Sequence, residues 1–386
     1  MDTLTILERL VAADTTSRTS NLALIEIVEE LLSAYGVESQ RVPNEDGTKA
    51  GLIARIGPEV DGGVVLSGHT DCVPVDEQPW STDPFELHED GGRLYGRGTA
   101  DMKGFLAAVL AQLDVLAGAG LERPVILALS YDEELGTLGA PSLVAELLAS
   151  QPRPAAVVVG EPTSLQVVNA HKGVRAFTTT VHGLDAHSSQ PQRGANAIAA
   201  LARVATAIDD LATRHREAAA DPDFEPPYTT FNLATIQGGQ AINIIPRRAE
   251  MTWEYRPVPA DDNDAILQQV QERAENEVLP RLRATHPDGA IEFTTDALVP
   301  TLAPEEDGAA EALVRDIMEI HAPAETVAFG TDGGHFQAAG LSTVVFGPGS
   351  IDQAHQPDEY IAAAQLERFA PFIPRLASRL ESESSD

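Results

Sequence analysis

Cysteine and lysine are nearly absent from this sequence of 386 residues, and each shortage excludes something. The single cysteine, Cys72, cannot form an internal disulfide bond, which fits a reducing compartment. Only three lysines, Lys49, Lys103 and Lys172, accompany an acidic excess that gives a net charge of −33. Nucleic acids and anionic membranes both bind basic surfaces, so this charge argues against either partner.

Long apolar runs are also missing. No stretch reaches the roughly 18 consecutive apolar residues that a membrane-spanning helix needs. The first residues, Met1-Asp2-Thr3, include an acidic residue where a secretory signal has basic residues, and no apolar signal core follows. We therefore expect a cytoplasmic protein without a membrane partner.

The acidic excess also bears on stability. A net charge far from zero makes a compact chain repel itself, and dissolved salt screens this repulsion. We hypothesise that the protein is adapted to a saline environment. Ordinary solubilising charge is the alternative explanation of the same composition.

The order of apolar patterns predicts an α/β fold. We expect two domains, because the chain is longer than the usual limit for a single hydrophobic core. Helices and buried strands alternate up to Glu161, which is typical of a mixed or parallel sheet with helices on both faces. A helix over residues 305–321, a strand over 343–346 and a helix over 360–380 resume this pattern. We expect the polar tail from residue 381 to be frayed.

The middle of the chain has a different pattern of apolar and polar residues, which predicts an inserted α+β domain over residues 173–297. Four stretches alternate apolar and polar residues, as one-sided antiparallel strands do. Two helical stretches between them would cover one face of that sheet. The first domain then comprises residues 1–172 and 298–386. The predicted strands span residues 174–181, 229–236, 248–256 and 291–295, and the predicted helices span 195–216 and 261–277.

Three short apolar runs, predicted to be buried strands, each lead into potential metal ligands. The first run leads to His69 and Asp71, the second to Glu133 and Glu134, and the third to Glu161. In an open α/β sheet the carboxyl ends of strands form the ligand crevice, so these residues are expected to meet there.

Two further candidates complete a site for two metal ions. Asp101 lies in a glycine-rich loop where the backbone can approach an ion closely, and His355 lies near the C-terminus. Imidazole and carboxylate ligands suggest zinc, with cobalt or manganese as substitutes. Two neighbouring ions need a shared ligand, for which Asp101 is the candidate. One ion would take His69 and Glu161, and the other Glu134 and His355.

Two acidic residues beside these ligands have other expected roles. Glu133 needs no metal itself and is placed to take a proton from water and deliver it to a leaving amine. Asp71 is placed to hold the second imidazole nitrogen of His69. Singly, a His-x-Asp loop or a Glu-Glu pair is more often an ordinary surface feature. Together, these residues are less well explained as surface features, because each follows an apolar strand or lies in a glycine-rich loop.

These motifs together resemble the M20 metallopeptidase family, in order and across nearly the whole chain. The acetylornithine deacetylase branch is the most similar, through AHKG at residues 170–173 and the run over residues 347–360. The motifs are SGHTD at 67–71, GTADMKG at 98–104, DEE at 132–134, GEPT at 160–163 and HQPDE at 355–359.

The resemblance implies the same ligand and base assignments, and it adds expectations about the insert. Residues 173–297 would form a lid and dimerisation domain, so we expect a homodimer. The peptide bond between Asp101 and Met102 would be cis. His187 matches a histidine that donates to the developing oxyanion, from the partner subunit. Asn243 and Arg256 match positions that hold the substrate carboxylate; without the resemblance, all three would be ordinary loop or strand-end residues.

The resemblance implies an enzyme that removes an N-acetyl group from an amino acid, namely N-acetyl-L-ornithine to L-ornithine and acetate in arginine biosynthesis. One departure concerns side-chain specificity: Asp332, expected to contact substrate, and His335 lie in a loop that should line the pocket. The alternatives are another M20 activity, such as succinyl-diaminopimelate desuccinylase, dipeptidase or acetylcitrulline deacetylase, and a catalytically silent homologue that binds metal or ligand. Glu133 argues against a catalytically silent homologue, since a protein that only binds metal or ligand needs no free carboxylate beside Glu134.

Overall fold

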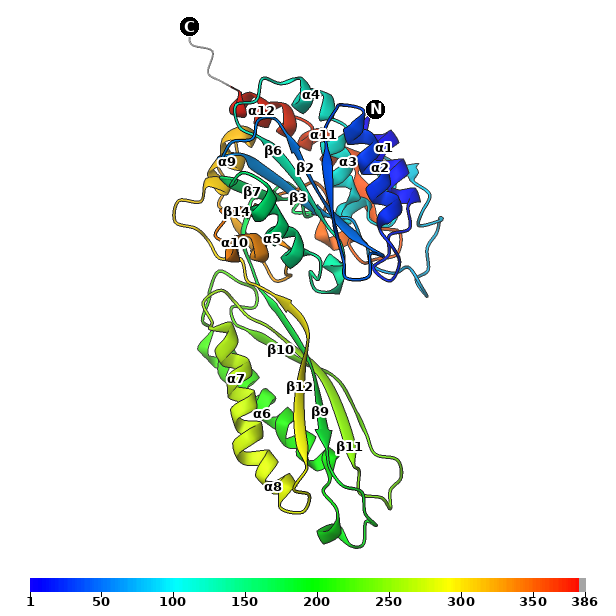
Figure 1. The fold of residues 1–386 in the computed structure, drawn as a ribbon, viewed down its shortest axis with the longest axis vertical. Coiled ribbons are helices and arrows are strands. Elements are labelled where there is room, and N and C mark those ends of the chain that lie inside the picture. Colours follow the sequence, from blue (N-terminus) through cyan, green and yellow to red (C-terminus); the bar gives the residue numbers. More distant parts are fainter. Residues whose placement is uncertain (382–386) are drawn as a thin grey trace. The chain divides into compact units, whose positions relative to one another are not determined.

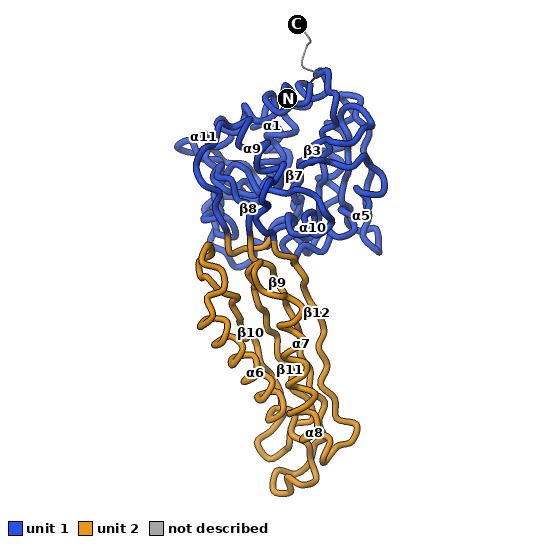
Figure 2. Tube along the Cα trace, turned by 90° about the vertical axis from the view of Figure 1, so that its left-hand side faces the viewer, with its two compact units in different colours: residues 1–170, 302–326, 331–386 blue, residues 171–301, 327–330 orange. Residues whose placement is uncertain are grey.

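The computed structural model describes residues 1–381, which form two compact units (Figure 2). Unit 1 comprises residues 1–170, 302–326 and the chain from residue 331 onward; unit 2 comprises residues 171–301 and 327–330. The expected insert, residues 173–297, lies within unit 2. The short return at 327–330 has no signal in the sequence pattern. The expected fraying of the tail concerns residues that, except for Glu381, lie outside the described part.

Unit 1 is built on an eight-stranded mixed sheet (Figure 1), which confirms the predicted fold class. Strand β3 pairs in parallel with β6 and β7, so their carboxyl ends lie at the same edge. All three strands are fully buried, because helices cover both faces of the sheet. In sheet order the strands are β1 (Ser39–Pro43), β2 (Ala50–Ile56), β6 (Val125–Ser130), β3 (Val64–His69), β7 (Ala156–Val159), β14 (Thr343–Val345), β8 (Val168–His171) and β13 (Glu325–Val327).

The helices of unit 1 bury apolar residues at helical spacing. The first helix, α1, buries Ile6, Leu7 and Leu10 and is capped at its N-terminus by Asp2, whose side chain accepts from Thr5 N. The helices of this unit are α1 (Thr3–Ala12), α2 (Leu22–Ser33), α3 (Gly104–Leu110), α4 (Leu113–Gly118), α5 (Ala140–Ser150), α9 (Ala309–Met318), α10 (Gly333–Ala338), α11 (Ala363–Phe369) and α12 (Phe372–Leu380).

A small three-stranded sheet corrects one prediction. Strands β4 (His88–Asp90) and β5 (Arg93–Tyr95) form a hairpin whose turn consists of two glycines, Gly91 and Gly92. Strand β15 (Tyr360–Ala362) pairs with β5, so the predicted helix over residues 360–380 is wrong at its start. The pairing of Tyr360 with Tyr95, whose ring centroids lie 5.4 Å apart, replaces the first helical turn.

Unit 2 is a four-stranded antiparallel sheet with helices on one face (Figure 1), as the alternation predicts. Along β11 every second residue is buried, and Trp253 and Tyr255 pack there against Phe177. In sheet order the strands are β10 (Thr230–Gly238), β11 (Arg248–Arg256), β9 (Val174–His182) and β12 (Ala290–Val299), and the helices are α6 (Ala197–Ala218), α7 (Asn263–Arg273) and α8 (Leu279–Arg283).

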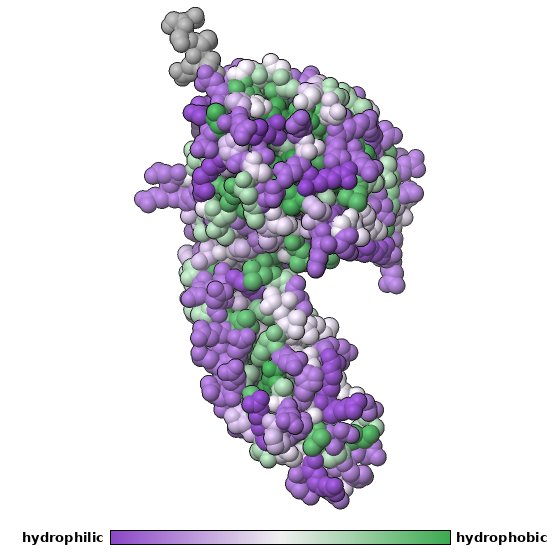
Figure 3. All heavy atoms as spheres, viewed as in Figure 1, coloured by the Kyte–Doolittle hydropathy of each residue, from purple (hydrophilic) through white to green (hydrophobic). Residues whose placement is uncertain are grey.

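The surface agrees with the composition. Hydrophilic residues cover most of the visible face of each unit (Figure 3). Within residues 1–381 no helix is both long and apolar enough to cross a membrane.

Candidate metal centre

Two groups of potential metal ligands share one carboxylate in unit 1. The first group is His69, Asp101 and Glu161, and the second is Asp101, Glu134 and His355; within each group the ligand atoms lie within 4.8 Å of one another. Asp101 Oδ1 lies 2.9 Å from His69 Nε2, and Asp101 Oδ2 lies 3.4 Å from His355 Nε2. A carboxylate that turns a different oxygen toward each group is suited to bridging two ions.

The ends of neighbouring parallel strands supply the first group. Strand β3 ends at His69, and its neighbour β7 is followed by Gly160 and Glu161. Gly160 is required by close packing, because a Cβ atom there would lie 2.2 Å from the ring of Phe105. His69 Nε2 and Glu161 Oε1 are 3.9 Å apart, and both side chains are buried. The peptide bond between Asp101 and Met102 is cis, as the resemblance implies.

The second group is more open. His355 Nε2 lies 2.9 Å from Glu134 Oε2; the His355 side chain is 52% exposed, whereas that of Glu134 is 7% exposed. Among the described residues, Glu134 Oε1 is buried and has no hydrogen-bond partner. A buried carboxylate oxygen without a partner is costly, and a cation would satisfy it. The residues therefore fit a pair of divalent ions, and their imidazole and carboxylate donors suit zinc, cobalt or manganese.

The electrostatics of the cluster also fit bound cations. Burial, together with the charge on Asp101, raises the pKa of Glu161. Burial would also raise the pKa of Asp101, but hydrogen bonds with His355 and His69 outweigh it and lower that pKa. Hydrogen bonds with Asp101 and Glu134 raise the pKa of His355 to about 10. Carboxylates thus outnumber cationic groups in a buried place, which divalent ions would balance.

Glu133 belongs to neither group of ligands. Its side chain is half-buried, and burial and the charge on Glu161 raise its pKa well above the usual value. Its backbone N–H donates to Asp71 Oδ1 over 3.1 Å, and the N–H of Glu134 donates to Asp71 Oδ2 over 3.3 Å. Asp71 also approaches His69, whose Nδ1 lies 2.9 Å from the Asp71 backbone oxygen and 3.6 Å from Oδ1. Asp71 therefore fixes both the imidazole and the loop that bears Glu133.

Asp332 lies in unit 1 but offers almost no surface to a ligand. Its side chain is 1% exposed and accepts a hydrogen bond from Ser130 Oγ at the end of β6. Burial raises its pKa to about 6. The sequence places this aspartate in a pocket-lining loop, whereas its burial suits support of the β6 end.

The other residues predicted to contact substrate, His187, Asn243 and Arg256, lie in unit 2. His187 is exposed and contacts the hydroxyl of Ser189 at 2.7 Å. Its segment pairs with the one that carries Asn243, since Ser188 N donates to Asn243 O over 3.0 Å. Arg256 ends β11, and its Nε lies 3.1 Å from Glu254 Oε1. The structure thus brings His187 and Asn243 together, and sets Arg256 at the end of a strand.

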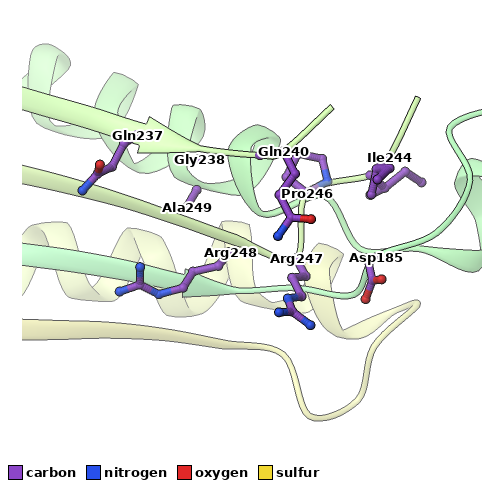
Figure 4. A pocket seen from close by; sticks show the side chains of 11 residues that line it. Asp185, Gln237, Gly238, Gln240, Ile244, Pro246, Arg247, Arg248 and Ala249 are labelled. Atoms are coloured by element: carbon purple, nitrogen blue, oxygen red, sulfur yellow. The ribbon is translucent and has the colours of Figure 1, made fainter. Parts of the chain in front are cut away.

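A cavity of about 390 Å³ lies beside the paired segments of His187 and Asn243 (Figure 4). Asp185, Arg247 and Arg248 contribute charged side chains to its wall, together with the end of β10. The cavity lies within unit 2 and contains none of the potential metal ligands.

Several supporting residues carry no spacing signal in the sequence. Lys49 forms an ion pair with Asp132, directly before Glu133, and also donates to the backbone oxygen of Ser17. Ser17 Oγ donates to Asp71 Oδ2 over 2.7 Å. These residues come from distant parts of the chain, so that only the fold reveals their contact with the loop.

Comparison with known proteins supports the assignment to a family. Residues 65–379 match peptidase family M20/M25/M40. The acetylornithine deacetylase of Proteus mirabilis is 36% identical over 92% of this chain and 89% of its own length. That of Myxococcus xanthus is 36% identical over 96% of this chain and 95% of its own.

Solved structures share the fold. Aminopeptidase PepT from Bacillus cereus superposes with a TM-score of 0.73 at 18% identity, covering 98% of both chains. Human carnosine dipeptidase 1 superposes with a TM-score of 0.69 at 18% identity, covering 97% of both chains. The family match spans most of the chain and includes every potential metal ligand described above. The chain therefore belongs to peptidase family M20/M25/M40 and is one of its metal-dependent hydrolases.

Proposed function

We propose that this hydrolase removes the acetyl group from the α-nitrogen of N-acetyl-L-ornithine, giving L-ornithine and acetate in arginine biosynthesis. The observation that carries the two-metal chemistry is Asp101, whose two oxygens face His69 and His355. The choice of substrate rests on the relatives named acetylornithine deacetylase, which are 36% identical over more than nine-tenths of the chain.

Two divalent ions, zinc or else cobalt or manganese, would be held by the two groups. His69, Asp101 and Glu161 would hold one ion, and Asp101, Glu134 and His355 would hold the other. When bound, the ions supply Lewis-acid polarisation of the scissile carbonyl and of a water molecule.

Glu133 is the general base in this proposal. It accepts a proton from the attacking water and passes it to the leaving nitrogen as the amide C–N bond breaks, so that acetate and the free amine form. Its half-buried carboxylate and raised pKa suit a group that exchanges protons near neutral pH. Asp71 and the buried Asp332 are positioning residues, because each binds the backbone or a side chain at the end of β6.

The lid, unit 2, supplies the substrate contacts in this proposal. His187 donates to the oxyanion that develops on the acetyl carbonyl oxygen. Asn243 and Arg256 hold the α-carboxylate, for which the planar guanidinium of arginine is suited because it can form two parallel hydrogen bonds.

The lid also forms a homodimer in this proposal, with His187 acting at the site of the partner subunit. Support comes from the edge strand β10 and the loop after it, where Leu233, Ile236 and Ile242 are 43%, 60% and 101% exposed. An edge strand with exposed apolar side chains is suited to pairing with a second copy.

A substrate panel tests the proposed activity. The purified protein, loaded with zinc or cobalt, is assayed with N-acetyl-L-ornithine, N-acetyl-L-citrulline, N-succinyl-L,L-diaminopimelate and an unblocked dipeptide. We expect the highest kcat/KM with N-acetyl-L-ornithine and loss of activity after metal removal with a chelator. A higher kcat/KM with one of the other three would assign the corresponding M20 activity instead.

A further inference from the structure

A buried ion pair lies next to the metal-ligand groups and takes no part in the proposed reaction. Arg97 Nη1 lies 2.7 Å from Glu359 Oε2, and both side chains are 1% exposed. Burying two charges costs free energy unless further hydrogen bonds compensate. The partners of these two side chains therefore indicate what the pair does.

Glu359 binds the backbone of the loop that carries Asp101. Its Oε1 accepts from the N–H groups of Ala100 at 2.9 Å and Asp101 at 3.1 Å. Its Oε2 accepts from the N–H of Gly98 at 2.9 Å in addition to Arg97. One carboxylate thus accepts three N–H groups of this loop and restrains the backbone from which the Asp101 side chain extends.

Arg97 connects the same carboxylate to the turn that carries His355. Arg97 Nη2 donates to Gln78 Oε1 over 2.6 Å, and Gln78 Nε2 donates to the backbone oxygen of His355 over 3.1 Å. The guanidinium also lies 5.0 Å from the ring centroid of Trp80, whose Nε1 donates to Gln78 Oε1.

The turn needs such support. His355 has a φ of 62°, in the left-handed region that non-glycine residues rarely adopt. Its half-exposed imidazole contacts Asp101 and Glu134 through Nε2. The hydrogen bond from Gln78 to its backbone oxygen therefore restrains the residue from the main-chain side.

We propose that Arg97, Glu359 and Gln78 are positioning residues for the metal ligands, and that Gln78 acts on one metal position, the one formed by Asp101, Glu134 and His355. Glu359 and Gln78 contact the backbone of Asp101 and His355, two of its three ligands, and Arg97 donates to both Glu359 and Gln78. In the other position only Asp101 receives such support, because His69 and Glu161 are fixed by the ends of β3 and β7. This inference rests on the metal assignment under the proposed function.

Zinc titration of the whole protein tests the proposal. Metal-free wild type, Glu359→Gln and Gln78→Ala are titrated with zinc ions alone by calorimetry, and the bound zinc is measured after dialysis. The amide in Glu359→Gln keeps the size of the side chain but offers one oxygen fewer to the loop N–H groups. Loss of a residue that orients metal ligands lowers metal affinity by about 10–100-fold. We expect Gln78→Ala to cause that loss for one of the two ions and to leave the affinity for the other unchanged, because Gln78 contacts His355. Glu359→Gln acts on Asp101, which belongs to both groups of ligands, and should weaken both ions.

Ligand variants identify which ion is weakened. In a His355→Ala background, which lacks the ligand that Gln78 contacts, Gln78→Ala should not weaken the remaining ion further. In a Glu161→Ala background, Gln78→Ala should weaken the remaining ion by about 10–100-fold. Glu305→Gln is the matched control, since the carboxylate of Glu305 also accepts a backbone N–H, that of Thr343, but contacts no ligand loop. It should leave both zinc affinities unchanged.

Each outcome has a distinct meaning. If wild type binds two zinc ions and both Glu359→Gln and Gln78→Ala retain both affinities, the positioning role is wrong. Equal weakening of both ions by Gln78→Ala also contradicts it, because a general loss of stability would act on both positions. If Glu359→Gln does not fold, the half-buried Gln78→Ala decides the matter by the same criterion. If wild type itself binds fewer than two ions, the metal assignment fails before the inference is reached.

Discussion

The roles of individual carboxylates in this site follow from their contacts. Asp101 lies between two histidines, Glu134 leaves one oxygen without a partner among the described residues, and Glu133 contacts neither histidine within hydrogen-bond distance. Asp71 accepts two backbone N–H groups and therefore acts on the loop. Similar acidic side chains thus divide into candidate ligands, a proposed base and a support.

One residue-level prediction concerns Arg256. Its replacement by alanine should raise KM for N-acetyl-L-ornithine by about 10–100-fold, because a hydrogen bond to a charged group contributes about 1.5–3 kcal/mol. For the amide analogue of the substrate, which has no carboxylate, the same replacement should raise KM much less. Steady-state kinetics with both compounds measure the difference.

Glu254→Gln provides the control for Arg256. It removes the charge that pairs with Arg256 Nε but keeps the guanidinium, so KM should change little. Equal penalties of Arg256→Ala for the acid and its amide analogue would remove Arg256 from the substrate contacts.

The sequence predicts candidate ligands better than it predicts their supports. His69, Glu134 and Glu161 follow apolar runs, so their neighbourhood at one sheet edge can be expected from pattern alone. Arg97 and Lys49 contact segments that are distant in sequence, and neither periodicity nor a motif predicts such contacts. The burial of Asp332 likewise depends on where its loop meets β6.

At the level of secondary structure, the strands of unit 1 bring residues from distant parts of the chain together. The parallel strands β3, β6 and β7 are continuous apolar runs, so the sequence predicts their burial. Strand β15 is different, because its three residues precede a helix directly and share its apolar character. Pairing with β5, a tertiary interaction, decides its conformation.

The contact between β7 and α3 gives an element-level prediction. In Gly160→Ala the new methyl group would overlap the ring of Phe105, which a Cβ would approach to 2.2 Å. Such overpacking destabilises a protein by about 1–3 kcal/mol. It should also displace the neighbouring Glu161 and weaken zinc binding. Urea unfolding of the metal-free protein and zinc titration measure the two effects.

Gly118→Ala is the matched control for Gly160→Ala. No atom lies within 4 Å of a Cβ built at Gly118, at the end of α4. The same substitution there should therefore change the free energy of unfolding little. Equal stability of the two variants would mean that α3 can move away from β7 without penalty.

At the level of the whole molecule, the edge strand of unit 2 leads to a prediction about assembly. Ile236→Asp places a charge on β10 where the proposed homodimer would bury an apolar side chain, and burying an unpaired charge is strongly unfavourable. We expect dissociation to monomers, measured by sedimentation velocity. Leu298→Asp on β12, at the opposite edge of the sheet, is the control, since Leu298 is similarly exposed at 45%. A wild-type protein that sediments as a monomer would contradict the proposed dimer.

The net charge of −33 leads to a second prediction about the whole molecule. Self-repulsion among the acidic side chains opposes the compact state, and the screening length falls from about 10 Å at 0.1 M salt to about 3 Å at 1 M. The melting temperature should therefore rise with added potassium chloride over that range. Sucrose of equal osmolality should give a smaller rise, because it does not screen charge. A constant or falling melting temperature in potassium chloride would reject adaptation to salt.

The central claim is that two metal ions and a separate general base act together, and Glu133→Gln tests it most directly. The substitution keeps the size of the side chain but removes its ability to accept the proton. Turnover of N-acetyl-L-ornithine should fall by about 10²–10⁴-fold, while zinc content after dialysis stays at the wild-type two ions per chain. Loss of zinc together with activity would show that Glu133 is a ligand, and turnover at the wild-type rate would show that another group moves the proton.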